Sequence, residues 1–163
     1  MSIVRDTLRL LLAAWLGASA LFSLVVAPGA FAVLPSRSLA GLVVGTVLPT
    51  LFYSGAVLGI AALLFSRNVE RAGRRLHAAL AALVALACLT AQLGVGARIA
   101  SLQASIGSSL DSLALADPRR VSFGRMHALS VSLLGLALVA AFALLVLETR
   151  ATSRALAARS GRD

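Results

Sequence analysis

The sequence predicts an all-α integral membrane protein, a bundle of four transmembrane helices with an amphipathic outer extension after the third helix. Its residues are 60% hydrophobic and only 13% charged, with a mean hydropathy of +0.96. A soluble domain carries about a quarter charged residues, so the composition indicates a membrane protein. The charged residues divide the chain into four apolar runs, each longer than the roughly 20 residues that a helix needs to cross a membrane.

The four runs predict spans at about residues 10–34, 39–66, 76–98 and 121–147, followed by a basic cytoplasmic tail at 148–163. All of them belong to one membrane domain, residues 1–163. Alternation with a period of two is absent, which favours helices over a membrane barrel. Pro28 and Pro49 are the expected kink sites, because each removes a backbone donor. These four predicted spans hold no Asp or Glu, so we expect no intramembrane acid for a proton relay.

The segment after the third run is helical in pattern. Apolar residues at Ile99, Leu102, Ile106 and Leu110 are spaced by three and four, which is typical of an amphipathic helix. We expect the third helix to continue out of the membrane or to bend at Gly107. The following Asp-Pro pair, 117–118, predicts a helix N-cap with proline at the first helical position.

The arginines predict the orientation. The chain has 15 arginines and no lysine, and ten of the arginines lie in the N-terminal segment, the middle loop and the C-terminal tail. Basic residues concentrate on the cytoplasmic side of membrane proteins, so both termini are expected there. The Arg-rich, Ala- and Leu-rich usage favours a bacterial inner membrane. Arginines that end apolar runs anchor helices, and this placement argues against a nucleic-acid partner.

Glycines of the second span form one stripe. Gly41, Gly45, Gly55 and Gly59 include two Gly-x-x-x-Gly pairs, which allow two helices to approach closely in lipid. Packing inside the monomer is the favoured interpretation. A specific homo-oligomer, most simply a homodimer, is the alternative.

A cluster of polar residues is expected at the outer interface. Arg98 ends the third run, Arg125 precedes the fourth, and His127 lies about 3 Å deeper than Arg125 by the helix rise. Ser130 is one turn further, and Arg37, between the first two spans, is expected on the same outer side. These residues are either snorkelling arginines with a satisfied histidine, or an outward-facing pocket for an anionic lipid headgroup or a small solute. We interpret His77, after the basic middle loop, as a solvated helix-end residue.

No catalytic group, metal site or cofactor is predicted. His77 and His127 lie at opposite membrane faces in this topology, more than about 20 Å apart, and cannot share one metal or haem. The single cysteine, Cys88, permits no thiolate cluster. Membrane lipids are the expected partners.

Two stretches carry a family resemblance. The first half, with Trp15, Gly17, Pro28, Phe31 and the Ala40–Gly41 pair, resembles the transmembrane protein 205-like family. The stretch FGRMHALSVSL resembles the entry of that family's final helix. The resemblance implies a four-helix membrane bundle without an established reaction.

More distantly, the chain resembles copper-resistance membrane proteins and haem-dependent protoporphyrinogen oxidases. It lacks both a histidine in the first helix and any lysine, so haem or oxidase activity is not carried over. A non-enzymatic membrane protein is the first hypothesis. A haem- or metal-linked oxidoreductase and a small transport component are the alternatives.

Overall fold

The computed structural model describes residues 2–69, 71–106, 113–114 and 116–160. It has the predicted all-α fold. The first span consists of α1 (Ser2–Leu21), the π-helical turn η1 (Phe22–Val26) and α2 (Ala27–Val33). The second consists of α3 (Arg37–Phe65) and the 3-10 turn η2 (Ser66–Asn68), and the third of α4 (Arg71–Leu89), the π-helical turn η3 (Thr90–Gly96) and α5 (Ala97–Ile106). The fourth is the single helix α6 (Pro118–Ser160).

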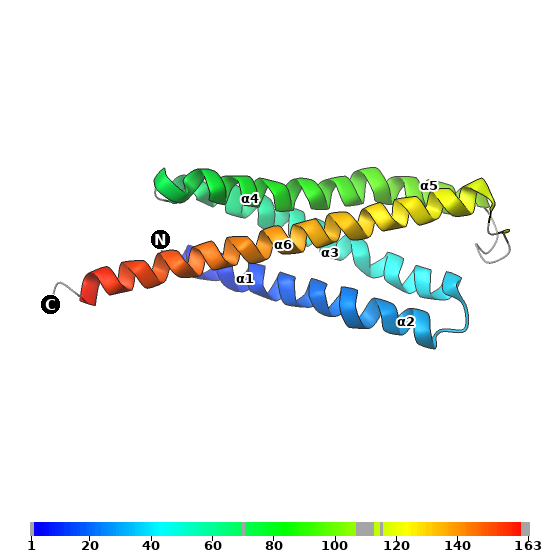
Figure 1. Cartoon of the computed structure of the whole chain (residues 1–163), viewed down its shortest axis with the longest axis horizontal. Coiled ribbons are helices and arrows are strands. Elements are labelled where there is room, and N and C mark those ends of the chain that lie inside the picture. The colour runs from blue at the N-terminus through cyan, green and yellow to red at the C-terminus, as the bar shows by residue number, and fades with distance from the viewer. Residues whose placement is uncertain (1, 70, 107–112, 115, 161–163) are drawn as a thin grey trace.

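Four stretches are long and apolar enough to cross a membrane. They are Ile3–Val33, Arg37–Asn68, Gly73–Ile106 and Pro118–Arg150. Each begins before the predicted span or ends after it, because the helices continue past the apolar runs. Both chain ends lie at one end of the bundle in Figure 1, which we call the termini end. The α2–α3 connection, the end of α5 and the start of α6 lie at the opposite end, the loop end (Figure 1).

Side-chain caps begin two of the helices. The Ser36 hydroxyl accepts a hydrogen bond from the Leu39 amide at 3.2 Å ahead of α3. Ahead of α6, the Asp117 carboxylate accepts one from the Arg119 amide at 2.8 Å, which confirms the predicted N-cap with proline at the first helical position. The Arg119 guanidinium also bonds this carboxylate and holds the pKa of Asp117 below its usual range.

Two of the spans change their helical pitch. In the first, the Ala27 amide bonds the Phe22 carbonyl five residues back, just before Pro28. A π turn is a common cause of a helix kink, and here it adjoins the predicted kink site. The third span has such a turn at Thr90–Gly96 without any proline. In contrast, α3 stays helical through Pro49.

The core is built from small residues around one aromatic anchor. Trp15 is 5% exposed, and its indole N–H donates to the Leu51 carbonyl at 2.9 Å. Around it pack residues of all four spans, including Phe52, Val84 and Cys88 and a set of alanines on α6: Ala137, Ala140 and Ala141. A second cluster of Leu12, Ala62, Ala81 and Leu144 lies nearer the termini end. Small side chains allow helices to pack closely where lipid provides no hydrophobic driving force.

The third span continues into α5, which confirms that its helix extends past the apolar run. The predicted bend at Gly107 lies outside the described residues. Likewise, α6 remains helical through Ser160, so residues 148–160 of the expected tail extend the fourth helix. The first residue of that tail, Glu148, is buried in the bundle.

Candidate ligand-binding cavity

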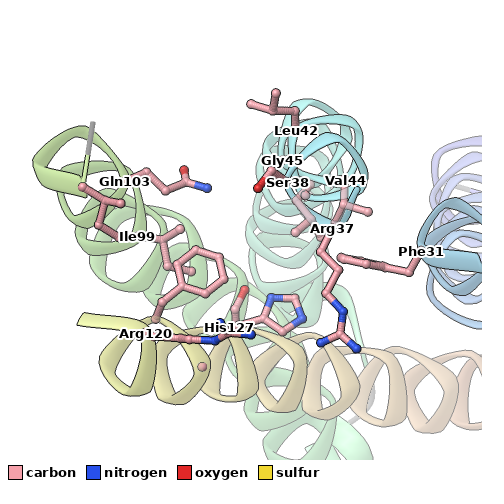
Figure 2. A pocket seen from close by; sticks show the side chains of 16 residues that line it. Phe31, Arg37, Ser38, Leu42, Val44, Gly45, Ile99, Gln103, Arg120 and His127 are labelled. Atoms are coloured by element: carbon pink, nitrogen blue, oxygen red, sulfur yellow. The ribbon is translucent and has the colours of Figure 1, made fainter. Parts of the chain in front are cut away.

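A cavity of about 600 Å³ lies at the loop end of the bundle, between α3, α5 and α6. Figure 2 shows α6 along one side of it, with Gln103 of α5 and Arg37 of α3 extending into the space above. Apolar side chains make up most of its wall: Phe31, Leu42, Val44, Leu48, Ile99, Ile106 and Phe123.

The bundle is open here because its helices separate toward the loop end. Along the third span, α4 packs extensively against α3, whereas α5, beyond the π turn, packs against α6 and η3. On the α3 side, no side chain fills the space beside Gly41 and Gly45, because a methyl group added at either position would meet no heavy atom within 4 Å. The separation of the helices and the two glycines together create the space.

Three nitrogen-bearing side chains that can hold positive charge line the cavity: Arg37, Arg120 and His127. Its lining includes no Asp or Glu. The Arg120 guanidinium donates to the Leu113 carbonyl at 2.8 Å, which holds it near the mouth of the cavity. The carboxylate of Asp117 is engaged by Arg119 at 3.0 Å. Within the described part of the chain, the cavity therefore carries positive charge without a carboxylate to balance it.

His127 is held against an aromatic neighbour. Its ring is parallel to that of Phe123, one turn earlier on α6, with the ring centroids 6.4 Å apart. This spacing lies within the range of about 4.5–7 Å that aromatic pairs favour. One turn further along α6, Ser130 is 5% exposed and lines the deeper part of the cavity.

The structure divides the cluster predicted at this interface. His127 and Ser130 line the cavity, together with Arg37. Arg98 lines a separate hollow of about 400 Å³, and Arg125 is exposed and lines neither space. The sequence indicated a common depth but not a common direction. Arg125 precedes His127 by two residues, which is about 200° around a helix.

The glycine stripe is divided in a similar way. A methyl group at Gly55 would meet the Trp15 ring at 2.5 Å, and one at Gly59 would meet the Ala85 amide nitrogen at 2.6 Å. These two glycines permit close packing inside the monomer. A methyl group at Gly41 or Gly45 would meet no heavy atom within 4 Å, and these two glycines line the cavity instead.

At the termini end, three charged or titratable side chains meet in a second site, which we call the buried ion cluster: Arg9, His77 and Glu148. One Glu148 oxygen accepts hydrogen bonds from Arg9 at 2.9 and 3.1 Å. The other lies 2.7 Å from His77 Nε2. Arg9 also donates to the Glu148 backbone carbonyl.

Two sequence-based expectations are wrong at the buried ion cluster. His77 is 3% exposed rather than solvated, and Glu148 is 7% exposed and lies inside the fourth apolar stretch. Arg9 forms an ion pair with the carboxylate and His77 forms a hydrogen bond with it, both from other helices, which allows it to be buried. A signal was present in the sequence, because Glu148 is the one acid next to the fourth run and a histidine and an arginine flank other runs at the same end.

The two histidines lie at opposite ends of the bundle, His77 in the buried ion cluster and His127 in the cavity. Cys88 is buried in the core between them. The described residues include no group of three or more His, Cys, Asp or Glu side chains positioned to hold a metal ion.

Comparisons with known proteins add a family. No curated protein and no solved structure shows a significant match to the chain. The resemblance to the transmembrane protein 205-like family therefore stays a prediction. A family model does match residues 10–108, which is more than half of the chain and covers most of the first span and all of the second and third. The chain belongs to the family described as Domain of unknown function (DUF4149).

Proposed function

We propose that this protein is an integral membrane protein of the bacterial inner membrane that binds an oxyanion in the loop-end cavity. The oxyanion is a carboxylate or phosphate group, carried by an anionic lipid or by a small solute. In this proposal both termini are cytoplasmic, and the cavity opens on the outer side. The protein acts by binding rather than by catalysis.

One observation supports the proposal above the others. Arg37, Arg120 and His127 line an otherwise apolar cavity whose lining includes no carboxylate. Its volume of about 600 Å³ lies within the range typical of ligand sites, roughly 300–1,000 Å³. Apolar walls with a few convergent polar groups are also typical of such sites.

The chemistry of arginine favours an oxyanion. A guanidinium presents paired N–H donors that match the two oxygens of a carboxylate or phosphate. Arg37 is exposed, and Arg120 is half-buried and donates to the Leu113 carbonyl. An anion between Arg37 and Arg120 would accept hydrogen bonds from both guanidinium groups, and the amide of Gln103, which also lines the cavity, could bond its further polar atoms.

The test is native mass spectrometry of the protein in a non-ionic detergent, titrated with inorganic phosphate and separately with phosphatidylglycerol. We expect Arg37→Gln and Arg120→Gln each to weaken binding about tenfold or more, the effect of losing a hydrogen bond to a charged group. Arg98→Gln and Arg125→Gln are matched controls, since these arginines lie at the same end but do not line the cavity.

Equal losses in all four variants would mean that anions gather at the basic interface without a specific site, and the proposal would fail. Binding of phosphate alone would identify a small solute as the ligand, and binding of phosphatidylglycerol alone would identify a lipid. No binding of either anion by the unsubstituted protein would also reject the proposal.

The positions of the donor residues do not favour the alternative of a haem- or metal-linked oxidoreductase. His77 and His127 lie at opposite ends of the bundle, and the Nε2 atom of His77 is engaged by Glu148. The buried ion cluster, which was not predicted, gives the transport alternative an ionisable group inside the bundle, but none of the residues of that cluster line the loop-end cavity.

A further inference from the structure

We infer that the ligand of the loop-end cavity is a membrane amphiphile whose acyl chain lies against Gly41 and Gly45, with its anionic head between Arg37 and Arg120. This inference rests on the proposed oxyanion site and names the class of its ligand. Gly41 and Gly45 are then specificity-determining residues, because their missing side chains leave room for the chain.

The dimensions of the cavity fit a chain in one leaflet. On α3 the lining runs from Arg37 to Leu48, eleven residues further along the chain, which is about 16 Å of helix. On α6 it runs from Arg120 to Ser130, about 15 Å. A bilayer has a hydrocarbon core of roughly 30 Å, so the cavity covers about half of it. A free phosphate or small carboxylate would fill only a small part of that length.

The polarity of the wall changes along this length. Arg37 and Arg120 lie in the first turn of α3 and of α6, at the loop end. Further along α3, the lining consists of Leu42, Val44 and Leu48, with the two glycines beside them, while α6 contributes the polar side chains of His127 and Ser130 on the facing side. A head at the arginines therefore places a chain against apolar atoms, in the orientation that a lipid of the same leaflet already has.

The cavity is accessible from the membrane. Among its lining residues, Leu42 is 61% exposed and Phe31 is 43% exposed, both on the surface of the apolar spans. In Figure 2, Leu42 of α3 and Gln103 of α5 lie on the side of the space that faces away from α6. An amphiphile could enter laterally from the leaflet without first passing into water.

The test uses hexadecanoic acid that carries a diazirine at mid-chain, added to the protein in phosphatidylcholine nanodiscs. Irradiation inserts the diazirine carbon into nearby bonds, and peptide mass spectrometry locates the adducts. We expect adducts to concentrate in the Gly41–Leu48 segment. Unlabelled hexadecanoic acid should compete for this segment, whereas hexadecanol, which lacks the carboxylate, should compete much less.

Gly45→Leu, with Gly41→Leu as a second variant, should lower the adduct yield in this segment by about tenfold, the effect of placing a side chain in occupied space. Both positions are open in the structure, so the fold should tolerate the change. Gly17→Leu is the matched control: a side chain there also meets no heavy atom within 4 Å, but Gly17 does not line the cavity. Adducts spread evenly over lipid-facing helices, or unchanged by both substitutions, would overturn the inference.

The phosphate titration distinguishes this failure from that of the proposed function. If phosphate binds through Arg37 and Arg120 but the fatty-acid probe gives no localised adduct, the ligand is a small anion and only the amphiphile inference fails. If neither probe depends on these arginines, both proposals fail.

Discussion

At the residue scale, the buried ion cluster is the most demanding arrangement in the molecule. Arg9, His77 and Glu148 come from α1, α4 and α6, and the side chains of His77 and Glu148 are 4% and 8% exposed. A charge that is removed from water costs several kcal/mol unless partners compensate. The cluster satisfies both carboxylate oxygens, and it thereby fixes three helices relative to one another. His77 Nδ1 is buried and has no hydrogen-bond partner among the described residues.

Replacing Glu148 tests the structural role of the cluster. Glu148→Ala leaves Arg9 and His77 buried without their acceptor, so we expect a loss of about 3 kcal/mol in the free energy of unfolding. This is the lower end of the usual range, because Arg9 can extend toward the interface. The measurement is equilibrium unfolding in mixed detergent–SDS micelles.

Asp6→Ala is the control for this measurement. Asp6 is exposed and pairs with the same Arg9 at 3.4 Å, and exposed pairs contribute about 1 kcal/mol or less. A loss at Glu148 no greater than the loss at Asp6 would show that the cluster contributes little to stability.

The sequence did not predict this cluster because partners 71 and 139 residues apart meet only through packing. A single span indicates the depth of each residue but not the direction in which it points. The same limit applies to Arg125, which shares a depth with His127 and points elsewhere. His127 and Ser130, in contrast, lie one turn apart on one helix, and their common face follows from their spacing alone.

At the element scale, the glycines of α3 have two different roles: one pair permits close helix packing and the other leaves space for the cavity. The glycines look equivalent in sequence, because they form two Gly-x-x-x-Gly pairs. Toward the termini end, Gly55 and Gly59 bring α3 into contact with Trp15 and α4. Toward the loop end, Gly41 and Gly45 leave a space. The difference arises from the π turn in the third span, after which α5 packs against α6 and η3, and no sequence pattern indicated that turn.

Alanine substitutions should separate the two roles. In Gly59→Ala, the new methyl group would lie 2.6 Å from the Ala85 amide nitrogen and 3.0 Å from the Ala81 carbonyl oxygen. Backbone atoms cannot move aside locally, so the helices must part, at a cost of about 1–3 kcal/mol of stability. Gly41→Ala meets nothing within 4 Å and should be neutral or stabilising by up to about 1 kcal/mol, because alanine favours the helix.

Thermal unfolding of the two variants in the same detergent gives the comparison. Equal destabilisation would mean that α3 is packed along its whole length, for example against a second copy of the chain. In that case the homodimer alternative for Gly41 and Gly45 would regain support.

At the scale of the whole molecule, the sequence predicted the architecture well. The four spans follow from hydropathy, and the N-cap of α6 follows from the Asp-Pro pair before it. Both depend only on residues that are close together in the sequence. The cavity could not be predicted, because it depends on how far α5 separates from α3. Of the residues with basic side chains that line the cavity, His127 belonged to the predicted outer cluster. Arg37 was expected only on the same side of the membrane as that cluster, and Arg120 was not predicted as a site residue.

Orientation decides which compartment the cavity faces. The even number of spans places the two chain ends on one side, and the arginine distribution predicts that this side is cytoplasmic. Two exposed positions report the opposite ends of the bundle: Asn68, in η2 at the termini end, and Ala116, ahead of α6 at the loop end. Cys88 is fully buried, so the natural thiol should not react and need not be removed.

In intact bacterial cells, a membrane-impermeant maleimide should label Ala116→Cys and should label Asn68→Cys only after the membrane is permeabilised. That result would place Arg37, Arg120 and His127 on the outer side, where they would meet lipids of the outer leaflet. The reverse pattern would turn the cavity toward the cytoplasm and make cytoplasmic anions its available ligands. Labelling of both positions in intact cells would mean that the chain inserts in two orientations, since one orientation exposes only one end of an even-numbered bundle.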